Sequence, residues 1–122
     1  MKQPVRSYRD PVVWQRAMDF VERIYALTAA FPRQERFNLT DQLRRAAVPI
    51  PANIAEGHGQ SPAIFARHLN IALGSAAELD TLLELARRLA LFPPQQWEAL
   101  TQELTTIRKM LFGLRRSLQP PS

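Results

Sequence analysis

Cysteine is absent from this sequence of 122 residues, and histidine is nearly so. Without cysteine the chain can form neither disulfides nor thiolate zinc sites, and a reducing, cytoplasmic compartment is expected. The two histidines, His58 and His68, make no metal-binding spacing with each other or with a carboxylate pair, and the Glu-x-x-His motif of di-iron bundles is missing. No serine has a histidine partner that the sequence suggests. We therefore expect no metal, no cofactor and no enzymatic activity.

Long hydrophobic runs are also missing. The longest nearly uncharged stretch, between Arg67 and Glu78, is about half of the roughly 20 residues that a membrane-spanning helix needs. Lys2, Arg6 and Arg9 interrupt the N-terminal segment, which therefore has no signal-peptide hydrophobic region. The sequence thus predicts a single globular domain that is cytoplasmic and makes no membrane contact.

Lysine is scarce, although the chain is basic. Of the 16 basic residues only Lys2 and Lys109 are lysines, and with 11 acidic residues the net charge is +5. Arginine suits bidentate contacts with phosphate, and an excess of positive charge is typical of nucleic-acid-binding proteins. A GC-rich genome produces the same arginine bias, so composition alone leaves a nucleic-acid ligand open.

Four segments show apolar residues at alternating intervals of three and four, and no segment alternates with period two over a useful length. Four helices with short connections fold as an all-α, antiparallel up-down-up-down four-helix bundle. We expect three parts in the chain: a flexible basic arm over residues 1–9, the bundle over residues 10–119 and a disordered tail over residues 120–122.

Caps and helix breakers mark the ends of these segments. Asp10-Pro11 and Ser61-Pro62 each place a capping residue before a proline at the first helical position. Pro32 stops the first helix, and Phe92-Pro93-Pro94 separates the third from the fourth. Gly57 ends the second helix, where glycine is the usual residue for a left-handed turn.

Two prolines, Pro49 and Pro51, stand inside the second predicted helix. Each removes a backbone donor and pushes its ring against the carbonyl four residues earlier. The residue before each proline, Val48 or Ile50, is biased toward extended geometry. We expect the second helix to be kinked or broken at Pro49/Pro51, with Pro51 restarting it at its first turn.

Polar residues flank this break, and one further acid lies on the third helix. They are Gln42, Arg44, Arg45, Asn53, Glu56 and Glu78. One interpretation is a structural hydrogen-bond network that satisfies the freed carbonyls and fixes the helix register, since buried polar groups are paired wherever they occur. The other is a binding or catalytic site. We favour the structural network, in which Glu78 pairs with Arg44 or Arg45.

The third predicted helix carries two adjoining apolar stripes, which is more than a single bundle core requires. The second stripe contains Ile64, Ile71, Leu82, Leu85 and Leu89. A mid-helix glycine costs about 1 kcal/mol relative to alanine, and close approach of another backbone is the usual compensation. We therefore predict a homo-oligomer. Its expected interface residues are Gly74, Ser75, Ala76 and Ala77.

Basic residues gather on the fourth predicted helix, where no acid follows Glu103. They are Arg108, Lys109, Arg115 and Arg116. One interpretation is that cations near a helix C-terminus complement the macrodipole. The other is a phosphate-binding strip, with Arg16 and Arg23 of the first helix as secondary contacts. The two interpretations remain open at the level of the sequence.

One mid-chain stretch, Leu39-Thr-x-Gln-Leu-Arg-Arg-Ala-Ala-Val-x-Ile-Pro-x-Asn-Ile-Ala-Glu-Gly57, resembles a known family of four-helix-bundle proteins. These are the proteins encoded in intervening sequences of 23S ribosomal RNA genes, and they include the accessory variability protein of diversity-generating retroelements. Trp14, Phe31-Pro32 and the stretch from Leu69 to Glu78 match as well. The resemblance implies an up-and-down bundle that tends to form pentameric rings, and it implies no established activity for most members.

Together these observations favour a non-enzymatic, homo-oligomeric scaffold, expected from the resemblance to be a homopentameric ring. Its basic surface would bind RNA or DNA through phosphate contacts, or a nucleic-acid enzyme such as a reverse-transcriptase-like protein. The alternative is a protein-binding adaptor without nucleic-acid contact.

Overall fold

The protein is described by a computed structural model, which describes residues 8–9 and 11–119; within these residues every regular element is a helix and none is a strand. The elements are α1 (Val12–Ala29), the short 3-10 helix η1 (Arg33–Glu35), α2 (Leu39–Ala47), α3 (Pro49–Gly57), α4 (Pro62–Arg88) and α5 (Pro94–Ser117). The predicted all-α class is confirmed. The predicted arm over residues 1–9 and the tail over 120–122 fall almost entirely outside the described residues.

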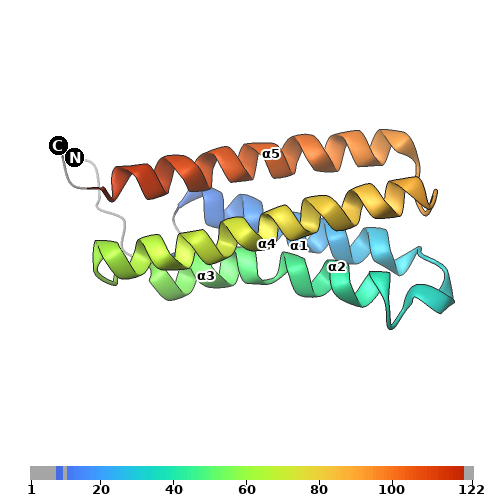
Figure 1. Ribbon diagram of the computed structural model, residues 1–122, viewed down its shortest axis with the longest axis horizontal. Helices are drawn as coiled ribbons and strands as arrows, with labels where there is room; N and C mark the ends of the chain where they lie inside the picture. Colours follow the sequence, from blue (N-terminus) through green and yellow to red (C-terminus); the bar gives the residue numbers. More distant parts are fainter. Residues whose placement is uncertain (1–7, 10, 120–122) are drawn as a thin grey trace.

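The helices form an elongated four-membered bundle in which α2 and α3 follow one another along the same edge (Figure 1). The chain reverses direction after α1, after α3 and after α4, so that sequential arms run in opposite directions (Figure 1). The arm made of α2 and α3 packs against α1 and α4, and α5 also packs against α1 and α4. Within the described chain α1 and α4 make no contact, so they lie diagonally opposite, as do α5 and the α2–α3 arm.

The core consists of the apolar seams that the sequence predicts. Every arm contributes large side chains that are fully buried: Phe20, Ile24, Leu43, Ile50, Ile54, Leu69, Leu79, Leu83, Leu104, Ile107 and Leu111. Burying such a side chain contributes about 1.5–3 kcal/mol relative to leaving it exposed. This burial fixes the rotation of each helix about its own axis and decides which residues face outward.

Among the described residues, none of the helices is both long and apolar enough to cross a membrane.

The predicted interruption of the second helix divides it into α2 and α3 at Val48. Val48 keeps right-handed helical dihedral angles (φ −59°, ψ −39°), and α3 begins at Pro49. The expectations of extended geometry at Val48 and of a restart at Pro51 were therefore wrong. Ala47 and Ile50 on either side are fully buried, and this packing holds the chain on its helical course despite the missing proline donors.

Two glycines shape the connection from α3 to α4, in different ways. Gly57 does not adopt the predicted left-handed turn; the positive φ of 83° belongs to Gly59. A Cβ atom on Gly57 would lie 2.7 Å from Phe65 Cδ1 and 2.9 Å from His68 Cβ. Glycine is therefore required at position 57 because α3 and α4 approach each other there.

Helix starts follow the predicted capping only in part. Ser61 accepts a hydrogen bond from the Ile64 amide (3.3 Å), and Pro62 follows at the first helical position, as predicted. Pro11 precedes α1 rather than opening it, and Asp10 lies outside the described residues. Boundary differences of one residue are ordinary at helix ends.

At the far end of α4, hydrogen bonds and charges close the turn into α5. The Leu91 amide donates to the Ala86 carbonyl (3.1 Å) and the Ala90 amide to the Arg87 carbonyl (2.9 Å), the pattern of a Schellman motif. Glu84 accepts hydrogen bonds from Arg87 and Arg88. These bonds, with that from Arg87 the stronger, lower the pKa of the Glu84 carboxyl to about 2. The positive charges in this turn are thus compensated locally.

The close approach at Gly57 predicts opposite effects of alanine at two helical glycines. Gly57→Ala should lower the free energy of unfolding by about 1–3 kcal/mol, because Phe65 and His68 must shift to admit the methyl group. Gly113→Ala should raise it by up to about 1 kcal/mol, since nothing lies within 4 Å of that position. Urea denaturation measures both, and equal effects would contradict the close approach.

The carboxylate of Glu84 should make stability depend on pH in acid. Its folded-state pKa of about 2 lies below the ordinary value of 4.5 for a glutamate carboxyl, so the ionised carboxylate stabilises the fold above about pH 4.5, and this contribution is lost as the pH falls toward 2. Thermal denaturation should show Glu84→Gln less stable than the parent at pH 7, with the difference shrinking between pH 4.5 and 2. Glu98→Gln, on the exposed surface of α5, is the control. A pH-independent difference would refute the linkage.

Candidate nucleic-acid interface

Four cations on the last three turns of α5 form the cationic strip, defined as Arg108, Lys109, Arg115 and Arg116. They occupy two neighbouring rows, and partners in a row are seven residues, or about 10.5 Å, apart along the axis. Arg115 Nη1 donates to Asn70 Oδ1 of α4 (2.7 Å). This contact places Arg115, and with it Arg108 seven residues earlier, on the side of α5 that faces α4.

Aromatic and basic side chains alternate along this surface. Phe112 is 40% exposed and lies between Arg108 and Arg115 on one face of α5. The guanidinium carbon of Arg115 is 5.0 Å from the centroid of the Phe112 ring, a cation–π contact. The sequence prediction missed Phe112, although an aromatic residue four after one arginine and three before another is a visible signal.

Among the described residues, none of the four strip cations forms an ion pair with a carboxylate. The sequence contains no aspartate or glutamate in residues 57–77, which include the facing half of α4, or in residues 104–119. Arg67 is a further, exposed cation on α4, three residues before Asn70. Arg67 was also missed, although it is the one charged residue in a long uncharged stretch. At one end of the α4–α5 pair, Glu84 therefore offsets part of the positive charge of Arg87 and Arg88. At the other end, the positive charges of the strip have no such partner among the described residues.

The helix dipole accounts for only part of this charge. Arg115 and Arg116 lie in the last turn of α5, which ends at Ser117. The dipole effect falls off within that turn, and Arg108 and Lys109 lie about two turns earlier. Complementing the macrodipole therefore explains Arg115 and Arg116, but it does not explain Arg108 and Lys109.

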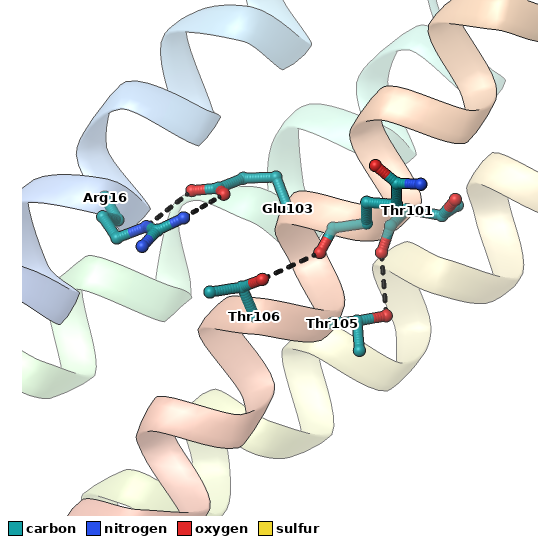
Figure 2. Close-up of polar contacts among 6 residues, drawn as sticks. Arg16, Thr101, Glu103, Thr105 and Thr106 are labelled. Atoms are coloured by element: carbon teal, nitrogen blue, oxygen red, sulfur yellow. Dashed lines mark hydrogen bonds and ion pairs between the residues drawn. The ribbon is translucent and has the colours of Figure 1, made fainter.

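Neither Arg16 nor Arg23, the predicted secondary contacts for phosphate, extends the cationic strip. Figure 2 shows Arg16 of α1 reaching across to Glu103 of α5, with hydrogen bonds of 3.0 Å from Nε and 2.6 Å from Nη2. The hydrogen bond to Glu103 raises the pKa of the Arg16 guanidinium, so its charge is committed within the bundle. Arg23 lines a separate hollow between α1 and the beginning of α5. We exclude both arginines from the interface.

The hydroxyl groups around Glu103 are also engaged. Thr105 donates to the Thr101 carbonyl (2.8 Å) and Thr106 to the Gln102 carbonyl (3.1 Å), each within α5 (Figure 2). Their hydrogens therefore point back along the helix, and the guanidinium and ammonium groups of the strip are the strong donors on this part of α5.

The predicted polar network does not form one cluster. Arg44 faces α1, where it donates to Thr28 Oγ1 (2.9 Å) and the Tyr25 carbonyl (3.3 Å) and lies 4.5 Å from the Tyr25 ring centroid. Gln42 donates to Asn38, and Arg45 pairs with Asp41 on the surface. These contacts are local or tie α2 to α1, as a structural role requires.

The other half of the network ties α3 to α4. Asn53 donates to the Pro49 carbonyl (2.8 Å), which leaves its Oδ1 to accept from His68 Nδ1 (3.0 Å). Glu56 lies 3.9 Å from the same ring nitrogen. Glu78 has no hydrogen bond or ion pair within the described chain, so the expected pairing with Arg44 or Arg45 is wrong. In the part of the chain described, no three potential metal ligands of the His, Cys, Asp and Glu types come together.

The small-residue patch lies only partly on the surface. Gly74 and Ala77 are exposed and Ser75 is half-buried, but Ala76 is 0% exposed and belongs to the core of its own subunit. An apolar stripe beside the patch is defined by Ile64, Ile71, Leu85 and Leu89, which are 42–53% exposed. The surplus apolar surface that the sequence predicts on this helix is thus present in part. Leu82, predicted to belong to it, is 8% exposed and packs in the core, and Ala76 of the predicted interface is likewise buried.

Comparison with known proteins agrees with the resemblance seen in the sequence. A solved structure with 33% sequence identity and a TM-score of 0.80 is that of a protein with unknown function from the S23 ribosomal protein family of Bacteroides thetaiotaomicron; the match covers 86% of this chain and 96% of that one. No curated protein matches the chain. The family model for 23S rRNA-intervening sequence proteins matches residues 9–113. Because this match spans most of the chain, the protein belongs to the 23S rRNA-intervening sequence protein family.

Proposed function

We propose that the protein is a non-enzymatic, homo-oligomeric scaffold of the cytoplasm that binds nucleic acid through the phosphate backbone. The observation that carries this proposal is the uncompensated cationic strip: four cations, with Arg67 beside them, face a region of α4 and α5 that contains no carboxylate. Arginine and lysine at such a surface make phosphate contacts, which position a ligand without specifying its sequence. The description of the family, which refers to intervening sequences of 23S rRNA, is consistent with a nucleic-acid context.

Assembly would strengthen this binding. One strip supplies four cations, which is few for tight binding at physiological salt because every phosphate contact weakens as salt rises. In a ring, expected from the family resemblance to have five subunits, a long polyanion contacts several strips at once, and avidity multiplies the affinity. The exposed apolar residues of the stripe on α4 support self-association, since exposed apolar surface marks interaction sites. The exposed Glu78 divides the stripe between Ile71 and Leu85.

The same apolar stripe supports a second candidate, a protein-binding adaptor. In that case the partner would be a protein, for example a reverse-transcriptase-like enzyme that itself holds the nucleic acid. Salt dependence separates the two candidates, because phosphate contacts weaken steeply with salt and an apolar protein contact does not.

Charge reversal tests the strip. Replacing Arg108, Lys109, Arg115 and Arg116 together by glutamate should abolish binding of a long RNA or duplex DNA in fluorescence anisotropy. For the parent, log affinity should fall linearly with log salt, with a slope near the number of phosphates neutralised. The control reverses four exposed arginines elsewhere, Arg23, Arg33, Arg36 and Arg45, and changes the net charge by the same amount. Parent-like binding by the strip variant would exclude the strip and favour the adaptor.

A bulky residue at Gly74 tests the oligomer. Nothing within the subunit lies near Gly74, so Gly74→Leu should leave the helical fold intact while it blocks close approach of a neighbouring subunit. Sedimentation velocity at micromolar concentration should show the parent as an oligomer and Gly74→Leu as a monomer of about 13.9 kDa. Gly113→Leu, at an equally open glycine on α5, is the control and should remain assembled. A parent that sediments as a monomer would end the ring proposal.

A further inference from the structure

An apolar hollow lies at the end of the cationic strip, between the beginning of α4 and the end of α5. Its volume is about 710 Å³, within the range of pockets that hold small organic molecules. Pro62, Ala63, Ala66 and Leu118 provide apolar walls, and Asn70 and Arg115 lie among the lining residues as polar groups. The hollow is open to solvent and adjoins the surface to which phosphates would bind.

We propose that this hollow seats an unstacked base, so that the preferred ligand of the strip is single-stranded nucleic acid. The inference rests on the proposed function, because the phosphates of that strand are held by the cationic strip. A duplex keeps its bases paired and stacked and presents only its backbone to such a surface, whereas a single strand can turn a base outward into an apolar site.

Arg115 connects the two parts of this site. Its guanidinium belongs to the cationic strip and also lines the hollow, and the 2.7 Å hydrogen bond to Asn70 fixes its position. A phosphate bound at Arg115 would therefore place the attached nucleoside at the mouth of the hollow. Asn70 uses its Oδ1 as the acceptor of that bond, which leaves its amide hydrogens for acceptors on the base.

Phe112 supplies a second surface for a base, before the hollow along the strip. The ring is 40% exposed and flanked by cations on the same helix face, and one side of it is covered by Arg115. Aromatic rings interleaved with basic residues are typical of sites that bind single strands, because every base has a π-face that can stack. The site thus offers one apolar seat and one aromatic surface beside a phosphate-binding row.

Filling the hollow tests the inference. The probes are a labelled oligothymidylate and a labelled DNA duplex of the same length, compared by fluorescence anisotropy. Ala66→Phe should weaken oligothymidylate binding by about tenfold, the effect of losing one stacked base, and leave duplex binding unchanged. Ala63→Phe, at an exposed position of the same wall, should act alike, so the result does not depend on one variant folding. Ala29→Phe, at an exposed position on α1 away from the hollow, is the control and should bind both probes as the parent does.

The outcomes separate this inference from the proposed function. If the strip variant loses both probes while Ala66→Phe and Ala63→Phe bind oligothymidylate as the parent does, the hollow does not seat a base and only the inference fails. Equal weakening of both probes by the hollow variants would also overturn it, because that effect is not specific to an unpaired base. If the parent binds neither probe, both proposals fail and a protein partner remains.

Discussion

Burial of the apolar seams is the constraint on which the rest of the structure depends. Each helix turns its seam inward, and that rotation fixes where every other side chain points. On α5, the burial of Leu104, Ile107 and Leu111 leaves the cationic strip outside the core, with Arg115 toward α4. The candidate interface is therefore a consequence of core packing. It does not require a loop or a strained backbone to hold it, and it lies on two rigid helices.

The α4 and α5 pair shows how the same packing can serve different electrostatic roles at its two ends. At the turn, Glu84 pairs with both Arg87 and Arg88 and offsets one of their two charges, and Arg87 also covers the ring of Trp97 at 5.0 Å. At the other end, the four cations of the strip form no ion pair with any described carboxylate. Self-repulsion among uncompensated charges destabilises a compact state, and a bound polyanion removes that repulsion. The asymmetry therefore favours a ligand at the strip over a purely structural role.

Periodicity made the seams and the strip predictable, and Pro49 and Pro51 made the helix interruption predictable, because each depends on residues within one segment. Contacts between distant residues were not predictable in this way. Arg16 and Glu103 meet although 87 residues separate them, and no local pattern reveals that pairing. The polar network failed for a related reason: burial of Leu43 and Ile50 turns Arg44 toward α1, whereas Asn53 faces α4. Predictions of which residues face outward are sensitive to small errors in helix rotation, because consecutive side chains on a helix point about 100° apart. Ala76 is an example: of the four residues in its patch, it alone is wholly buried.

The proposed subunit contact and the cationic strip lie on neighbouring faces of α4. Ile64 and Ile71 lie four residues before and three after His68, which bonds to Asn53 of α3, so this end of the apolar stripe lies toward the α3 side. Asn70, which bonds to Arg115, marks the α5 side, and Gly74, four residues later, shares that side. The proposed assembly therefore requires that a neighbouring subunit at Gly74 leaves the strip open to a strand. Assembly of that kind adds one strip for each subunit, which is the geometry that avidity for a long strand requires.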